Sequence, residues 1–316
     1  MKREVRNGMK YHWVHQLNPF AMRYPSPAYG LGIPYSFGPV AGGLDDIPGF
    51  SNEMRKMPWY TKLRNADSFR AKYDPIMKKS YSKASVIFVA APYVSDIISS
   101  RFSSYSSCFF VNNEHGVDEI FARSKDFFNG EGVIKLLYVG RVVRSKGVRD
   151  LVRSLQYVDL SRVILDVVGD GNDLEFCIKE AHELGLSNNV VFHGRLDRTE
   201  IDSFYSSSDL MVFPSFREPS GGVVIEAMSH GLPQIVCDYG GPASMVSEGV
   251  EGLKIKPSNI ENYPSDIASV INSIISNPEL LPRFSRNALE KCKVDYLWEN
   301  KMSKVCSFIE QHRDFH

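Results

Sequence analysis

Short apolar runs alternate with longer amphipathic stretches from Val133 to Cys237, and this alternation constrains the fold most strongly. The spacing predicts strands over 133–139, 163–168, 190–192, 210–213 and 234–237, with helices over 148–158, 174–184, 198–206 and 223–229. Strands separated by helical patterns of about ten residues form right-handed βαβ units with a parallel sheet buried on both faces. This part of the chain is therefore predicted to be a Rossmann-like α/β domain.

The first 128 residues are less regular, with candidate strands over 12–16, 34–37, 86–90 and 108–111. These are too few for a complete doubly wound sheet. The polar segment 121–132 ends in glycines and precedes a new strand, which is typical of a domain boundary. We expect an N-terminal domain over 1–128, a second domain over 129–290, and a helical tail over 291–316 that packs back on the first. Pro278 and Pro282 are expected to break the helical pattern that leads into this tail.

Composition excludes several classes of protein. The 37 basic and 37 acidic residues cancel, so no overall field attracts the chain to nucleic acid or membranes. No window approaches the roughly 18 apolar residues that a membrane span needs, and the first ten residues lack the apolar core of a secretion signal. The five cysteines are scattered without a C-x-x-C pair, which favours reduced thiols. We expect a soluble, cytoplasmic protein with no nucleic-acid partner.

Two cations follow the strand over 133–139. Arg141 comes directly after Gly140, and Lys146 lies at the start of the next helix. Ligands of open α/β sheets bind at the carboxyl ends of the strands, so both cations are placed to meet an anion. The alternative is a solvated basic loop formed by Arg141, Arg144, Lys146 and Arg149.

Glycines and carboxylates follow the later strands. Gly169 and Gly171 either let the backbone approach a ligand or form a tight turn. After the strand over 210–213, a loop carries Glu218, and the next helix carries Glu226 and opens with Ser220, Gly221 and Gly222. The free N–H groups of a helix N-terminus favour an anion, and Glu226 is placed to accept hydrogen bonds from vicinal hydroxyls such as those of a ribose. Alternatively, Glu218 caps the helix and Glu226 is solvated.

In their order and spacing these motifs resemble a known family. G-R-x4-K-G begins at Gly140, G-x-G at Gly169, F-x-G ends at Gly194, and E-x7-E runs from Glu218 to Glu226. Together they resemble the nucleotide-sugar half of the retaining glycosyltransferases of family 4, which have the two-domain GT-B fold. The resemblance is close over 108–260 and looser before it. It implies an α/β protein of the GT-B class with two Rossmann-like domains, of which the N-terminal one is incomplete because the family's opening strands and glycine-rich loop are absent.

The resemblance also implies roles for single residues. Arg141 and Lys146 would hold the donor diphosphate, and Glu218 would bind the hydroxyls of the donor sugar. Further donor-binding positions are implied at Gly140, Gly169, Gly171, Arg195, Leu196, Ser220, Gly221, Gly222 and Glu226, with Glu226 on the ribose and Arg195 and Leu196 at the base. Fixed cations and a helix N-terminus stabilise a departing diphosphate without a metal ion, so we expect no cofactor and no essential metal. Asp45 and Asp46 are adjacent rather than spaced as Asp-x-Asp and are expected outside the donor site.

The sequence gives fewer signals for the residues that would bind the acceptor of the sugar. His15, Gly42 and Gly43 are its candidates, although His15 beside Trp13 and Val14 also suits a hydrogen-bonded core residue. Many relatives have a histidine where this chain has Gly38. His193 at a strand end suits a structural role or a donor contact equally.

Residues 50–83 hold nine basic and three acidic residues, an excess of 9 − 3 = +6, with interleaved aromatic residues. This composition suits an anionic membrane surface and a lipid-linked diphosphate acceptor. The alternative is a solvated helical face with its aromatic residues in the core. RNA binding is a weaker option, because no RNA-reading motif accompanies the basic residues.

We therefore predict a retaining glycosyltransferase that moves a sugar from a nucleotide-sugar donor to a lipid-linked oligosaccharide or polysaccharide acceptor. The resemblance to this family implies that the protein acts in the synthesis of a surface polysaccharide, such as lipopolysaccharide or O-antigen, at the inner face of the plasma membrane. Front-face transfer, in which the departing phosphate takes the acceptor proton, is favoured over Glu218 as a covalent nucleophile. The alternatives are a truncated donor-binding protein without turnover and a GT-B nucleotide-sugar epimerase.

Overall fold

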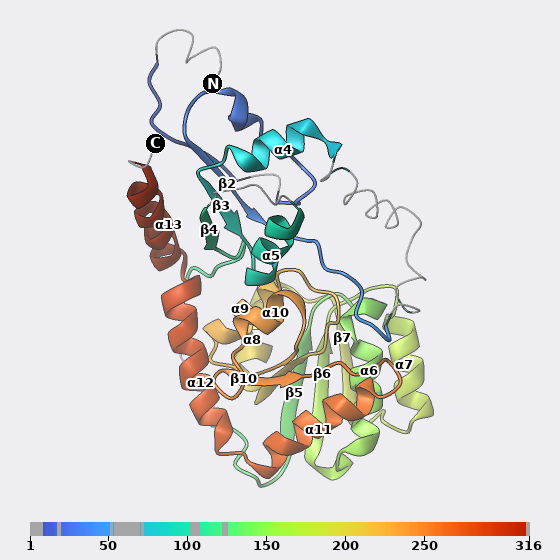
Figure 1. Cartoon of the computed structure of the whole chain (residues 1–316). Coiled ribbons are helices and arrows are strands. Elements are labelled where there is room, and N and C mark those ends of the chain that lie inside the picture. The colour runs from blue at the N-terminus through green and yellow to red at the C-terminus, as the bar shows by residue number, and fades with distance from the viewer. Residues whose placement is uncertain are drawn as a thin grey trace. The chain divides into compact units, whose positions relative to one another are not determined.

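The computed structural model describes residues 9–17, 20–50, 53, 70, 73–101, 108–121 and 126–313. It divides into two compact units, each built around one parallel sheet (Figure 1). The first unit takes its residues from Met1–Leu44, Met57–Glu114 and Lys301–His316. The second takes Asp45–Lys56 and His115–Asn300, so it begins earlier than residue 129 and includes a segment from the amino-terminal part of the chain.

The second unit contains a six-stranded sheet in the order β10-β9-β8-β5-β6-β7, and every neighbouring pair is parallel. Its strands are β5 (Ile134–Val139), β6 (Val163–Val168), β7 (Val190–Gly194), β8 (Leu210–Phe213), β9 (Gln234–Cys237) and β10 (Gly252–Ile255). From β5 the chain adds β6 and β7 toward one edge of the sheet, and from β8 it adds β9 and β10 toward the opposite edge. The topological switch point of the sheet therefore lies between β5 and β8, where open α/β sheets bind their ligands.

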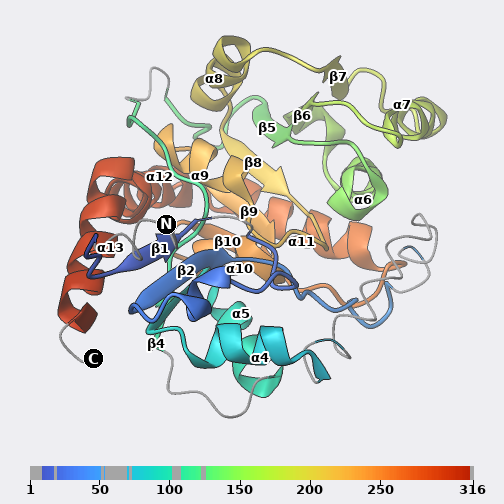
Figure 2. The same cartoon turned by 90° about the horizontal axis from the view of Figure 1, so that it is seen from above.

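Helices cover both faces of this sheet, with α6, α7 and α11 on one face and α8, α9 and α12 on the other (Figure 2). The α-helices are α6 (Val148–Ser154), α7 (Leu174–Glu183), α8 (Arg198–Ser207), α9 (Gly222–Ser229), α10 (Gly240–Met245), α11 (Tyr263–Ser276) and α12 (Leu280–Lys291). The short helical turns are η3 (Arg144–Lys146), η4 (Leu155–Tyr157), η5 (Leu160–Arg162) and the π-helix η6 (Cys292–Tyr296). Because both faces are covered, β8 and β9 are buried along their whole length.

The first unit contains a four-stranded parallel sheet in the order β1-β2-β3-β4. Its elements are β1 (Val14–Gln16), η1 (Pro27–Gly30), β2 (Tyr35–Val40), α4 (Pro75–Ser82), β3 (Val86–Val89), α5 (Pro92–Arg101) and β4 (Cys108–Val111). Ile87 and Val89 of β3 join a core cluster with residues of α4 and α5. Val86 and Phe88 point to the other face, because side chains alternate along a strand.

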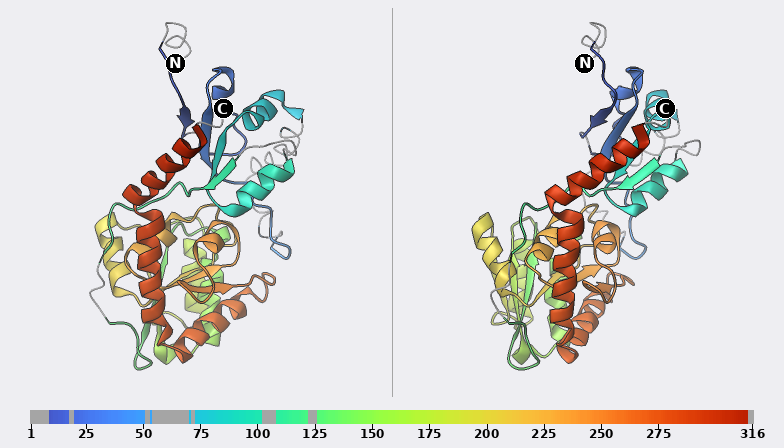
Figure 3. Two further views of the ribbon diagram at one scale, coloured as in Figure 1. Left: turned by 60° about the vertical axis from the view of Figure 1, so that its left-hand side comes forward. Right: turned by 90° about the vertical axis from the view of Figure 1, so that its left-hand side faces the viewer.

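That other face packs against α13 (Trp298–Arg313), which lies alongside the strands in both views of Figure 3. Val305 of this helix joins Val86 and Phe88, and the ring centroids of Phe308 and Phe110 lie 4.4 Å apart. Helices therefore cover both faces of this sheet as well. Every helix among the described residues is too short or too polar to cross a membrane.

The α/β architecture with parallel sheets is confirmed. The strands expected over 108–111, 163–168, 210–213 and 234–237 agree with β4, β6, β8 and β9 residue for residue. The helix expected over 148–158 ends as an α-helix at Ser154 and continues as η4. Pro282 does not break the tail as expected, because it lies in the first turn of α12, where a backbone N–H has no intrahelical acceptor.

Candidate active site

The loop after β5 turns Lys146 inward, toward the end of β8. Gly147, which follows η3, has φ +75°, and a Cβ there would lie 2.4 Å from the carbonyl oxygen of Pro214. Glycine therefore allows the loops after β5 and β8 to approach closely. Lys146 is only 6% exposed, and its Nζ lies 5.5 Å from the ring centroid of Phe213 at the end of β8.

Lys146 and Glu218 form an ion pair at the switch point of the sheet. The Nζ of Lys146 donates a hydrogen bond to Oε2 of Glu218, and the two side chains are 8% and 15% exposed. Oε1 of Glu218 accepts hydrogen bonds from the N–H groups of Ser220 and Gly221, both at 3.2 Å. Both carboxylate oxygens thus have donors. Glu218 therefore neutralises Lys146 and binds the turn that precedes α9, whereas the helix-capping contact weighed from the sequence, to the N–H groups of the helix itself, is not present.

Helix α9 begins beside this ion pair. Gly221 has φ +77°, which turns the chain into the helix, and α9 starts at Gly222. The N–H groups of Gly222 and Val223 have no intrahelical acceptor, because the first turn of a helix offers none. The ring of His115 lies against this end, since a Cβ on Gly222 would be 2.9 Å from it. Sequence analysis missed His115 at this position.

Arg141 differs from the other cations of its loop. Its side chain is exposed and makes no ion pair with any residue that the structure describes. Its carbonyl oxygen accepts a hydrogen bond of 2.9 Å from the hydroxyl of Tyr138. Burial, together with the charge of Glu218, raises the pKa of Tyr138 well above its usual value, so this hydroxyl stays a donor. The backbone of Arg141 is therefore fixed while its guanidinium stays accessible.

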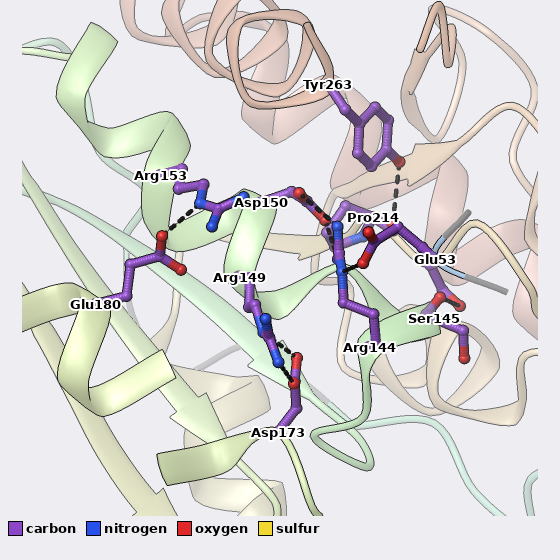
Figure 4. Close-up of polar contacts among 11 residues, drawn as sticks. Glu53, Arg144, Ser145, Arg149, Asp150, Arg153, Asp173, Glu180, Pro214 and Tyr263 are labelled. Carbon is purple, nitrogen blue, oxygen red and sulfur yellow. Dashed lines mark hydrogen bonds and ion pairs between the residues drawn. The ribbon is translucent and has the colours of Figure 1, made fainter. Parts of the chain in front are cut away.

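Arg144 is enclosed by two carboxylates (Figure 4). Its Nη1 lies 2.6 Å from Oδ2 of Asp150, and its Nε lies 2.5 Å from Oε2 of Glu53. Burial raises the pKa of Asp150 above the usual carboxyl value, and the charge of Arg144 opposes that shift. Arg149 is paired with Asp173 in the same view. The solvated basic loop is therefore wrong for Arg144, Lys146 and Arg149.

Gly169 and Gly171 bring the loops after β5 and β6 together. A Cβ on Gly169 would lie 1.8 Å from the carbonyl oxygen of Gly140, and one on Gly171 would lie 2.2 Å from that of Val142. Real Cβ atoms do not come so close, so each position requires glycine for this approach alone. The tight turn that the sequence offered as one alternative for Gly169 and Gly171 is therefore present.

Glu226 is held by two neighbours that sequence analysis did not identify. Its Oε1 lies 3.0 Å from Nη1 of Arg198, and its Oε2 accepts a 3.1 Å hydrogen bond from the hydroxyl of Tyr205. The carboxylate is 29% exposed. Glu226 is therefore not simply solvated, and a ribose bound there would share it with Arg198 and Tyr205.

The remaining predicted donor positions follow β7. Arg195 is exposed and Leu196 is half-buried. His193, at the end of the strand, lies 2.7 Å through its Nε2 from Oδ1 of Asp166, and its ring packs 4.5 Å from that of Phe204. These contacts give His193 a structural role.

The acceptor-side candidates belong to the first unit. Nδ1 of His15 lies 2.7 Å from the hydroxyl of Ser36, and its ring makes an edge contact with Phe88 at 5.0 Å. Burial lowers the pKa of His15, which favours the neutral imidazole. Gly42 and Gly43 follow the end of β2 with φ +106° and +78°. His15 is therefore a packed, hydrogen-bonded residue.

Asp46, which was expected outside the donor site, pairs with a residue next to Glu218. Its Oδ1 lies 2.5 Å from Nη1 of Arg217, the residue that precedes Glu218. Long-range pairing of this kind has no local sequence pattern, which is why the ion pairs of Asp46 with Arg217 and of Glu53 with Arg144 were not predicted.

The fold and this arrangement at the strand ends define a protein of the GT-B class of glycosyltransferases. Residues 120–291 match the family described as "Glycosyl transferases group 1", and the chain belongs to this family.

Two curated relatives illustrate the sequence match. An uncharacterized glycosyltransferase of Methanocaldococcus jannaschii is 29% identical over 166 residues, which cover 52% of this chain and 42% of the relative. The lipopolysaccharide core biosynthesis glycosyltransferase LpsE of Rhizobium meliloti is 29% identical over 162 residues, covering 49% and 46%. The chain spans less than half the length of these relatives.

Solved structures share the fold over almost the whole chain. Sucrose-phosphate synthase from Thermosynechococcus elongatus matches with a TM-score of 0.68 and 19% identity, covering 98% of this chain and 75% of the other. HepE of Anabaena in complex with UDP matches with a TM-score of 0.63 and 18% identity, covering 90% and 74%.

Proposed function

We propose that the chain is a retaining glycosyltransferase that moves a sugar from a nucleotide-sugar donor to a lipid-linked oligosaccharide or polysaccharide acceptor. The observation that carries the proposal is the enclosed ion pair of Lys146 and Glu218 at the switch point of the sheet. Family membership supports the reaction class. UDP bound to HepE supports a nucleotide donor, and the similarity to LpsE supports a surface polysaccharide as the product.

In this proposal the donor diphosphate binds between Arg141, Lys146 and the first turn of α9. Arg141 is accessible without a competing carboxylate among the described residues, and the diphosphate competes with Glu218 for Lys146. Once Lys146 turns to the phosphates, Glu218 can accept hydrogen bonds from the hydroxyls of the sugar. Glu226 binds the ribose, Arg195 and Leu196 flank the base, and the backbone at Gly140, Gly169, Gly171, Gly221 and Gly222 shapes the pocket.

The proposed chemistry breaks the bond between the anomeric carbon and the phosphate oxygen. Negative charge develops on the departing diphosphate, where two cations and the positive end of a helix stabilise it. These groups supply the charge that a metal ion supplies in other transferases, so the proposed reaction needs no essential metal. The departing phosphate oxygen takes the proton of the acceptor hydroxyl on the same face, and the configuration of the sugar is retained.

The proposal extends to a peripheral contact with an anionic membrane through residues 50–83. Part of this stretch lies outside the described residues. In the described part, Lys78, Lys79 and Lys83 are exposed at α4, and Ile76 on the same helix is 49% exposed. Exposed cations beside an exposed aliphatic side chain favour an anionic lipid surface. Such a contact would place the protein at the inner face of the plasma membrane, next to a lipid-linked acceptor.

A screen of nucleotide sugars tests the proposal. A donor that binds the folded protein raises its melting temperature, and turnover is then measured with lipid-linked acceptors, with and without anionic vesicles. Arg141→Ala is expected to weaken donor binding by about 2 kcal/mol, the scale of one charge-assisted contact, with little change in melting temperature because the side chain is exposed. Lys179→Ala is the matched control, because Lys179 is a 74% exposed cation on α7.

The same assay separates the competing functions. Binding without transfer or hydrolysis would indicate a donor-binding protein without turnover. An altered nucleotide sugar formed without acceptor would indicate an epimerase. If no nucleotide sugar stabilises the protein, the proposed function is wrong.

A further inference from the structure

A short segment from the amino-terminal part of the chain belongs to the second unit. We call its described residues, 45–50 and 53, the strap. The hydroxyl of Tyr239 donates a 2.7 Å hydrogen bond to the carbonyl oxygen of Asp45, and Nε of Arg144 donates a 2.5 Å hydrogen bond to Glu53. Between these ends, Asp46 pairs with Arg217 at 2.5 Å. The strap is therefore attached to the loops after β5, β8 and β9.

An apolar contact anchors the middle of the strap. Phe50 is 1% exposed, and its ring centroid lies 4.9 Å from that of Phe216 and 5.2 Å from that of Tyr263. The hydroxyl of Tyr263 in turn donates a 3.0 Å hydrogen bond to the carbonyl oxygen of Pro214 (Figure 4). Burial of three aromatic rings in one cluster favours a single arrangement of these side chains.

These contacts fall on the loop that carries Glu218. Phe216 and Arg217 are the two residues before Glu218, and the strap contacts both side chains. On the other side, Lys146 binds the carboxylate, and the N–H of Gly241 donates a 2.9 Å hydrogen bond to the carbonyl oxygen of Glu218. Glu218 is therefore held between the strap and the loops after β5 and β9.

We propose that Asp46 and Phe50 are positioning residues that fix the loop from Pro214 to Gly221 and thereby aim the carboxylate of Glu218. The catalytic consequence rests on the proposed function, in which Glu218 binds the donor sugar. The positioning itself is a property of the free protein. Asp46 and Phe50 contact Arg217, Phe216 and Tyr263, and none of these three residues holds the diphosphate in the proposed function. The geometry therefore points to an effect on turnover rather than on the binding of the nucleotide diphosphate.

The substitution Asp46→Asn removes the charge that pairs with Arg217 and keeps the side-chain shape. Asp46→Glu restores the charge, and Phe50→Leu removes the ring contacts. Asp45→Asn is the matched control, because Asp45 is exposed and binds Tyr239 through its backbone oxygen. These four variants separate the ion pair from a general effect of mutating the strap.

The first measurement is hydrogen exchange of the Ser220 and Gly221 amides in the free protein, since these amides donate to Glu218. Asp46→Asn and Phe50→Leu are expected to speed their exchange about tenfold, as expected for a loop that opens more often, while Asp45→Asn leaves it unchanged and Asp46→Glu restores it. Unchanged exchange in both Asp46→Asn and Phe50→Leu would overturn the positioning.

The second measurement uses a nucleotide sugar identified by the screen. Asp46→Asn is expected to lower kcat about tenfold, with UDP affinity within twofold of the unaltered protein, because misplacing a residue that orients the donor sugar affects the transition state most. A loss of UDP affinity with unchanged kcat would contradict the proposal. Faster exchange in a protein that binds no nucleotide sugar would keep the positioning and overturn the proposed function, so the two failures are distinguishable.

Discussion

The ammonium group of Lys146 is almost fully buried, and its charge is tolerated there because Glu218 pairs with it. An isolated buried charge is costly, whereas a paired and hydrogen-bonded one is tolerated. Glu218 supplies the opposite charge, and the amides of Ser220 and Gly221 satisfy its second oxygen. The residues proposed for catalysis thus also stabilise the ligand-free loops.

A double-mutant cycle tests this dependence at the residue scale. Lys146→Met and Glu218→Gln are each expected to lower the free energy of unfolding by about 2–3 kcal/mol, since each leaves its partner unpaired at low exposure. The double variant is expected to lose about 1–3 kcal/mol less than the sum of the two. Denaturant unfolding of the four proteins measures the coupling, and strictly additive losses would show that the pair contributes nothing to stability.

The residues of the candidate site differ in how readable they are from sequence. Arg141, Lys146 and Glu218 stand out because each follows the end of an apolar strand, where the fold predicts a ligand. Glu53 pairs with Arg144 across 91 positions, and Asp46 with Arg217 across 171. Such pairs leave no periodic or local pattern, so only the folded chain reveals them.

At the scale of elements, burial decides which strands can be predicted. Strands β8 and β9 have neighbours on both sides and are fully buried, so they read as unbroken apolar runs. Strand β10 lies at the edge of the sheet, and its two central residues are only half-buried. One of them, Lys254, lies 3.3 Å from Asp238 in an ion pair. A charged residue in a short edge strand removes the apolar signal, and this strand was not predicted.

The packing of α13 gives a prediction at the same scale. Phe308 lies 4.4 Å from the ring centroid of Phe110 and joins the cluster around Val86 and Phe88, so Phe308→Ala is expected to lower stability by about 2 kcal/mol. Met302→Ala on the same helix is the control, because Met302 is 44% exposed and should cost less than about 0.5 kcal/mol. Thermal unfolding measures both, and equal shifts would show that α13 contributes no specific packing.

At the scale of the whole molecule, the chain leaves the first unit after Glu114 and returns to it at Lys301. Lys301 is 3% exposed, and its Nζ donates a hydrogen bond to the carbonyl oxygen of Asn113. Burial lowers the pKa of Lys301 to about 8, although the charge of Glu114 opposes the shift. A buried cation with a lowered pKa couples the stability of the fold to pH.

The sign of this coupling follows from proton binding. Between pH 8 and 10.5 the folded protein has lost the Lys301 proton while the unfolded chain keeps it, so this residue makes stability rise with pH across that window. Its destabilising effect is fully present below pH 8 and amounts to about 3 kcal/mol.

Lys301→Met removes the charge and keeps much of the apolar stem. Between pH 8 and 10.5 the unaltered protein is therefore expected to gain about 3 kcal/mol of stability relative to this variant. Urea unfolding at several pH values measures it, with Lys293→Met, an exposed lysine, as the control. A difference that stays constant across the window would show that Lys301 keeps an ordinary pKa and that its burial does not link the fold to pH.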